Sequence, residues 1–93
     1  KIPEKIRWTA SDGNINNQVT KAAFLSVWDS KNKESLRIDL WTKDMPLDEM
    51  KLFFYQTLLS MSTTFNRATS DEKMSQTMVD FCDYFAEKLE LKK

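Results

Sequence analysis

Apolar and polar residues alternate in three stretches of the first half of the chain. Residues 6–10 alternate Ile, Arg, Trp, Thr and Ala, which predicts a half-buried strand. Two further strands are expected over residues 21–29 and 35–42, because both stretches are rich in β-branched and aromatic residues and a polar stretch separates them. These two strands are predicted to form a β-hairpin that follows the first strand.

The predicted hairpin has two faces of different character. If the hairpin closes around Lys31 and Asn32, Val27 lies opposite Leu36 and Leu25 lies opposite Ile38. One face is then aliphatic and consists of Leu25, Val27, Leu36, Ile38 and Leu40. The other, which we call the aromatic face, carries Phe24, Trp28, Arg37, Asp39 and Trp41. A slip of two residues in register keeps both sets together, so the assignment of faces does not depend on the exact register.

The second half of the chain has helical periodicity. Pro46 suits the first turn of a helix and acidic residues follow it, so a helix is predicted from Pro46 to about Ala68. Its apolar residues recur at spacings of three and four and are expected to face the sheet: Leu47, Met50, Phe54, Leu58, Met61 and Phe65. A weaker second stripe, consisting of Leu52, Tyr55 and Leu59, is expected to contact a neighbouring helix.

A second helix is predicted to begin at a capping box formed by Thr69 and Glu72. Its apolar positions are Met74, Met78, Phe81, Cys82, Phe85 and Leu89. Strands followed by consecutive helices are typical of the α+β class. We therefore expect an antiparallel sheet of three strands, followed by two α-helices packed on one sheet face. Residues 1–93 are expected to form a single domain, with a strand region over 1–45 and a two-helix region over 46–93.

Composition and charge narrow the function classes. Fourteen basic residues balance fourteen acidic ones, which argues against nucleic acid as a partner. Apolar runs reach only about four residues, so no membrane span is expected. The single cysteine favours a reducing compartment, and we expect the cytoplasm. Because the sequence opens without methionine, the natural N-terminus and any targeting signal are not visible.

The sequence offers little material for catalysis. It contains no histidine, which removes the commonest general base and metal ligand. Cys82 lies on a predicted apolar stripe, where burial disfavours the reactive thiolate. The single glycine, Gly13, cannot form a phosphate-binding loop, and no calcium-loop pattern is present. No catalytic residue, cofactor or metal site is predicted, and we expect a protein that is not an enzyme.

The aromatic face is the candidate functional site. If helices cover one side of the sheet, the opposite side should be mainly polar, and Phe24, Trp28 and Trp41 break that expectation. Tryptophan beside arginine is typical of the centre of a protein interface. Two alternatives remain open: an N-terminal segment preceding Lys1 could bury this face, or a symmetric homo-oligomer could use it.

Several segments resemble the GldC family of gliding-motility proteins. They read LSVWD at 25–29, LRIDLWTKDMP at 36–46 and DFCDYFAEKLEL at 80–91, and the likeness extends to 48–51 and 72–74. The resemblance implies a small accessory protein that has no enzymatic activity of its own and is grouped with the gliding motor and its secretion system. It also implies a further strand-like segment before Lys1, and it assigns no contact residue.

Three functions fit these observations to different degrees. The leading one is an adaptor or stabilising subunit that binds a protein of the gliding machinery through the aromatic face. The alternative is a chaperone-like holdase for secretion or motility-machinery clients, suggested by an order of sheet and two helices that secretion chaperones share at the level of fold analogy. An enzyme or small-molecule binder is the third, and it would need a deep polar pocket.

Overall fold

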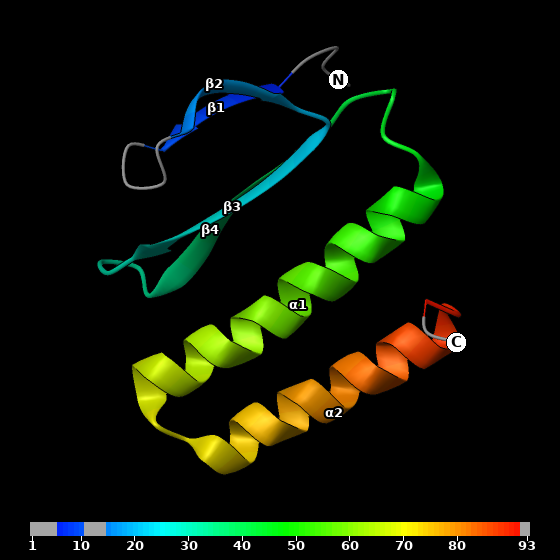
Figure 1. The fold of residues 1–93 in the computed structure, drawn as a ribbon. Coiled ribbons are helices and arrows are strands. Elements are labelled where there is room, and N and C mark those ends of the chain that lie inside the picture. The colour runs from blue at the N-terminus through cyan, green and yellow to red at the C-terminus, as the bar shows by residue number, and fades with distance from the viewer. Residues whose placement is uncertain (1–5, 11–14, 92–93) are drawn as a thin grey trace. The chain divides into compact units, whose positions relative to one another are not determined.

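The computed structural model describes residues 6–10 and 15–91, which form four strands and two helices (Figure 1). In chain order the elements are β1 (Ile6–Ala10), β2 (Ile15–Thr20), β3 (Ala22–Asp29), β4 (Glu34–Trp41), α1 (Leu47–Thr69) and α2 (Glu72–Lys88). Strands precede helices throughout the described residues, so the predicted α+β class is confirmed. The turn predicted at Ser11 to Asn14 lies outside the described residues.

The strands form two antiparallel pairs, β1 with β2 and β3 with β4. The three predicted strands are β1, β3 and β4, and the addition of β2 corrects the number of strands to four. The sequence of β2 is Ile-Asn-Asn-Gln-Val-Thr, and the three central amide side chains hide any alternation and have low strand propensity. Backbone pairing with β1, in which Ile6 lies opposite Thr20 and Arg7 opposite Val19, makes this segment a strand.

The β3–β4 hairpin has the predicted register, with Val27 opposite Leu36 and Leu25 opposite Ile38. Asp29 organises its turn. The carboxylate of Asp29 accepts the backbone N–H of Lys31 (3.0 Å) and the side-chain amide of Asn32 (2.9 Å). Lys33 then adopts a positive φ of 55°, and its N–H donates to the Asp29 carbonyl (2.8 Å), which closes the turn.

The two helices form an antiparallel pair joined by a short turn (Figure 1). The predicted capping box is wrong: Thr69 is the last residue of α1, and its hydroxyl donates to the carbonyl of Phe65 (2.8 Å). The N-cap of α2 is Asp71, whose carboxylate accepts the N–H of Met74 (3.0 Å). Ser70, with a φ of 58°, makes the reversal between the helices.

Small side chains are the most buried residues of the two-helix unit. Cys82 is 1% exposed, Ala86 is fully buried, and Ser62 and Ser75 are buried as well. Ser75, Cys82 and Ala86 recur at spacings of seven and four along α2, so they share one side of that helix. The burial predicted for Cys82 is confirmed. The predicted burial of Met74 and Phe81 is wrong, since both are about half exposed.

The chain divides into two compact units, Lys1–Pro46 and Leu47–Lys93. The second unit begins one residue after the predicted start of the two-helix region. The expectations of a single domain and of helices packed on one sheet face stay predictions.

Candidate functional site

The five residues of the aromatic face come together on the β3–β4 hairpin. Phe24 and Trp28 lie on β3, and Arg37, Asp39 and Trp41 lie on β4. In the register of the hairpin, Phe24 is opposite Asp39, Trp28 is opposite Ser35 and Trp41 is opposite Ala22. Residues directly opposite one another in an antiparallel pair project to the same side. The hairpin thus places all five predicted residues on one face.

Charge and aromatic rings are in contact within this face. The Nη2 atom of Arg37 donates to Oδ1 of Asp39 at 2.7 Å. The guanidinium carbon of Arg37 also lies 6.0 Å from the centre of the Phe24 ring, within the range of a cation–π contact. Arg37 therefore contacts both a carboxylate and an aromatic ring of this face.

The tryptophans of the aromatic face are accessible. Trp28 is 64% exposed and Trp41 is 46% exposed, whereas Phe24 is half-buried. Exposed tryptophan beside a partly accessible arginine provides apolar area together with directed hydrogen-bond donors, the combination found at the centres of protein interfaces. Chemically, the face suits binding to another protein surface.

The aliphatic face of the same hairpin is exposed as well. All five of its side chains are exposed: Leu25, Val27, Leu36, Ile38 and Leu40. The hairpin therefore presents apolar side chains on both sides, and an apolar patch of this kind is normally covered in the working state of a protein. The sequence pattern predicted tryptophan on the nominally polar face of the hairpin, whereas the aliphatic face was expected to lie under helices.

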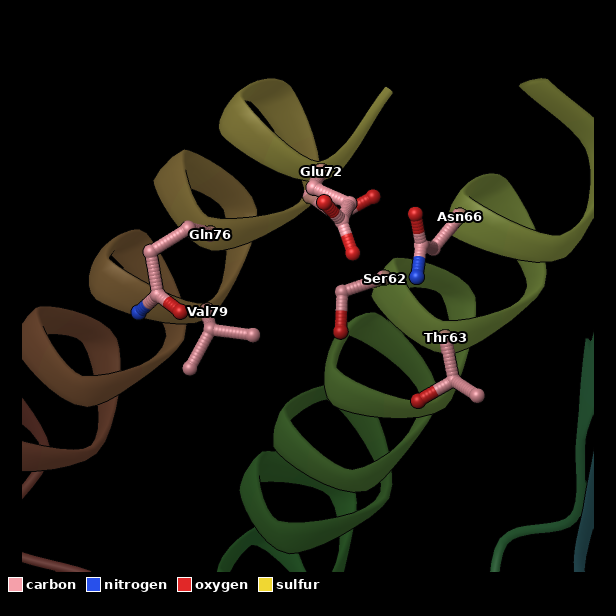
Figure 2. Close-up of a pocket in the computed structure, with 7 residues that line it drawn as sticks. Ser62, Thr63, Asn66, Glu72, Gln76 and Val79 are labelled. Atoms are coloured by element: carbon pink, nitrogen blue, oxygen red, sulfur yellow. The ribbon is translucent and has the colours of Figure 1, made fainter. Parts of the chain in front are cut away.

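A second candidate site is a cavity of about 300 Å³ between α1 and α2. Figure 2 shows Ser62, Thr63 and Asn66 extending from α1 and Glu72, Gln76 and Val79 from α2. Ser75 completes the lining. The sequence did not lead us to this site, although Ser62, Asn66 and Ser75 are polar residues at positions that face the neighbouring helix, a signal that could have found it.

The chemistry of this cavity is that of a polar layer between helices. The hydroxyl of Ser62 donates to the carbonyl of Leu59 (2.6 Å). Among the described residues, the hydroxyl of Ser75 and Oδ1 of Asn66 are buried and have no hydrogen-bond partner. Groups of this kind usually bind water, which needs two to four polar partners. The lining carries one carboxylate, Glu72, and its other polar groups are uncharged, so the cavity suits water better than a charged ligand.

The remaining predicted features concern Cys82, metals and membranes. Burial at 1% exposure places the Cys82 side chain away from solvent, beside an apolar cavity of about 200 Å³ that Leu58, Met78 and Phe81 help to line. Within residues 6–10 and 15–91, no three His, Cys, Asp or Glu side chains gather as a metal-binding group. Neither described helix has the length and apolar character needed to cross a membrane.

Comparison with known proteins identifies the chain by its family. Neither the curated proteins nor the solved structures include a significant match. The sequence model of a family described as gliding motility-associated protein GldC-like matches residues 3–91. That match includes every strand and helix described above, together with all five residues of the aromatic face, and agrees with the resemblance seen in the sequence. The chain belongs to the GldC-like family of gliding motility-associated proteins.

Proposed function

We propose that this protein is a non-enzymatic accessory subunit of the gliding machinery that acts by binding another protein of that machinery through its aromatic face. Membership of the GldC-like family supports the association with gliding motility. The adaptor role is supported by the arrangement of side chains on the β3–β4 hairpin.

The exposure of Trp28 is the observation that carries the proposal. A tryptophan that is 64% exposed in a folded strand leaves a large apolar surface in water. It shares its face with Trp41 and with the Arg37–Asp39 ion pair. Water-exposed ion pairs of this type add only about 0.2–1 kcal/mol to stability, so their position in the middle of an aromatic surface is better explained by recognition.

The residues also support a role without catalysis. The sequence has no histidine, and its one thiol belongs to the buried Cys82. A thiol in an apolar setting is a poor nucleophile because its thiolate form is disfavoured. Binding is therefore the activity for which these side chains are equipped.

Capture experiments with tryptophan variants test this function. Trp28→Ala and Trp41→Ala should each reduce the recovery of partner proteins from a gliding bacterium by about tenfold or more, because truncating a central interface tryptophan costs about 2 kcal/mol. Recovery is measured by affinity capture of the tagged full-length protein followed by quantitative mass spectrometry. Circular dichroism should show unchanged folding.

A matched control is Tyr84→Ala on α2. Tyr84 is 56% exposed and lies outside the aromatic face, so its truncation removes a similar accessible ring. This variant should recover the same partners as the unmodified protein. Equal recovery by the Trp28 and Tyr84 variants would contradict the proposal.

The holdase remains the second candidate because the hairpin exposes apolar residues on both faces. A holdase prefers unfolded clients and has little preference among their sequences. Suppression of the aggregation of an unrelated unfolded protein, at equimolar ratio, would favour it. Capture of one folded partner that depends on Trp28 would favour the adaptor.

A further inference from the structure

We propose that the outer edge of β4 pairs with β4 of a second copy of this chain, which forms a continuous four-stranded antiparallel sheet across a two-fold axis at Ile38. The surface involved is the edge of the hairpin, and its partner is an identical strand. This pairing does not depend on the gliding-machinery partner proposed above.

The edge of β4 is open to pairing. Among the described residues, β4 forms a ladder with β3 alone, and all eight of its residues are exposed. Its pairing with β3 runs without a register shift from the Ala22–Trp41 pair to the Asp29–Glu34 pair. Proteins usually protect a long regular edge with proline, a bulge, a short strand or charged side chains. β4 has no proline and no bulge and is eight residues long, and its charges are Glu34, Arg37 and Asp39. Such an edge is a template for another strand.

The alternation of backbone hydrogen bonds along β4 decides which of its residues direct their N–H and C=O groups to the outer edge. The N–H of Thr42 donates to the carbonyl of Lys21 (2.8 Å), just beyond the Ala22–Trp41 pair. Bonded and non-bonded pairs alternate in an antiparallel ladder, so Leu40 and Ile38 direct their N–H and C=O groups to β3. The same groups of Arg37 and Asp39 then point to the outer edge. A second strand must therefore place outward-bonding residues opposite one another.

Charge favours a two-fold axis at Ile38 over axes at the two adjacent residues, Arg37 and Asp39. A two-fold axis at Arg37 would put two arginines opposite each other, and an axis at Asp39 would put two carboxylates together. An axis at Ile38 places Arg37 opposite Asp39 of the second copy, and the symmetry produces this pair twice. Opposite charges directly across two strands stabilise their pairing, whereas like charges oppose it. The segment is thus self-complementary about Ile38.

The apolar side chains fit the same register. With the axis at Ile38, the two Ile38 side chains meet on the aliphatic face, and Leu36 lies opposite Leu40 of the second copy. Each copy contributes its own hairpin, so the strand order becomes β3, β4, β4 and β3. The two aromatic faces then lie on one side of one sheet, since in-register pairing keeps each side chain on its face. The dimer is a closed, isologous assembly.

Exchange of the two charges tests the pairing. The unmodified protein should sediment with twice the monomer mass at micromolar concentration. Arg37→Asp and Asp39→Arg, made singly, each place like charges opposite one another twice and should raise the dimer dissociation constant by about tenfold or more. The double variant R37D/D39R restores two opposite-charge pairs and should return the dissociation constant to near its original value. Sedimentation equilibrium measures all four proteins.

Control variants distinguish strand pairing from a general effect of charge or of misfolding. Lys31→Asp, in the hairpin turn, makes the same change of net charge as Arg37→Asp and should leave the dimer intact. Circular dichroism and thermal unfolding of each variant exclude misfolding as the cause of dissociation. A monomeric unmodified protein, or a double variant as weak as the single variants, would overturn the proposal. A dimer dissociation constant that is unchanged by both single substitutions would overturn it too.

The dimer edge and the aromatic face can be tested independently. Trp28 lies on β3, away from the outer edge of β4, so Trp28→Ala should keep the dimer while losing the captured partner. If Trp28→Ala forms the dimer and still recovers its partner in full, the proposed function of the aromatic face is contradicted, whereas the strand pairing is not. Loss of dimerisation in the charge variants supports the strand pairing. The function of the aromatic face is tested separately, by the capture experiment with Trp28→Ala.

Discussion

Asp29 shows how one side chain shapes the candidate site. Its carboxylate accepts bonds from Asn32 and Lys31, and the side-chain bond from Asn32, followed by the backbone bonds, lowers the pKa of this exposed carboxyl below its ordinary value. The turn that these bonds organise fixes the register between β3 and β4. The register in turn determines which residues share the aromatic face.

The lowered pKa predicts how the hairpin responds to acid. A carboxyl with a lower pKa in the folded state stabilises folding above its unfolded pKa, and the contribution is lost as pH falls through the folded value. Acidification below about pH 4 should therefore weaken the turn. NMR titration should place the Asp29 carboxyl below the ordinary aspartate range, and Asp29→Asn should lose this component of the pH dependence. A midpoint at or above the ordinary value would contradict the interpretation.

At the scale of elements, the two helices meet through small residues. Ser62 on α1 and Ser75, Cys82 and Ala86 on α2 are buried, while larger apolar residues such as Phe81 lie half exposed. Helices can approach closely only where the side chains between them are small. The helical spacing of apolar residues identified the apolar stripe of α2, but it does not indicate which residues are small enough to lie between the two helices. Steric fit between the helices instead buries Cys82 of that stripe together with Ser75 and Ala86, which are not part of it.

Enlarging one of these small buried residues should therefore destabilise the helix pair. Ala86 is fully buried, so Ala86→Leu is expected to lower the free energy of unfolding by about 1–3 kcal/mol through overpacking. Urea denaturation followed by circular dichroism measures the change. The adjacent exposed position provides the control: Glu87→Leu should alter the free energy of unfolding by less than about 0.5 kcal/mol. Equal effects of the two substitutions would contradict the assigned contact between the helices.

At the scale of the whole molecule, charge balance and surface character act together. Basic and acidic residues are equal in number, so no net repulsion separates two copies of the chain. The open edge of β4, bordered by apolar side chains on both faces, then offers a surface on which two copies could assemble. Such association would also satisfy the backbone groups that a free edge leaves to water.

Self-association predicts a stability that depends on protein concentration. Because the dimer forms only from folded chains, mass action should raise the midpoint of thermal unfolding as concentration increases. Scanning calorimetry from about ten to several hundred micromolar should show this rise for the unmodified protein and a smaller one for Arg37→Asp. A midpoint that is independent of concentration in the unmodified protein would argue against the dimer.

The sequence by itself determined the features that depend on local pattern. Alternation located β1, β3 and β4, and helical spacing located α1 and α2, because side-chain period reports directly on backbone geometry. The same alternation assembled Phe24, Trp28, Arg37, Asp39 and Trp41 on one face. Segment likeness identified the family, which the match over residues 3–91 confirmed.

Tertiary structure alone decided what depends on contacts between distant segments. β2 is a strand because it pairs with β1, although Asn16, Asn17 and Gln18 favour no strand. Asp71 caps α2 in place of Thr69 because Thr69 is the last residue of α1. There the Thr69 hydroxyl donates to the carbonyl of Phe65 in the same helix. The polar cavity at Ser62 and Ser75, and the open edge of β4, exist only once elements are paired. The local sequence pattern determines which face of its own helix or strand a side chain occupies. The residues that it contacts on other elements are determined by how those elements pair.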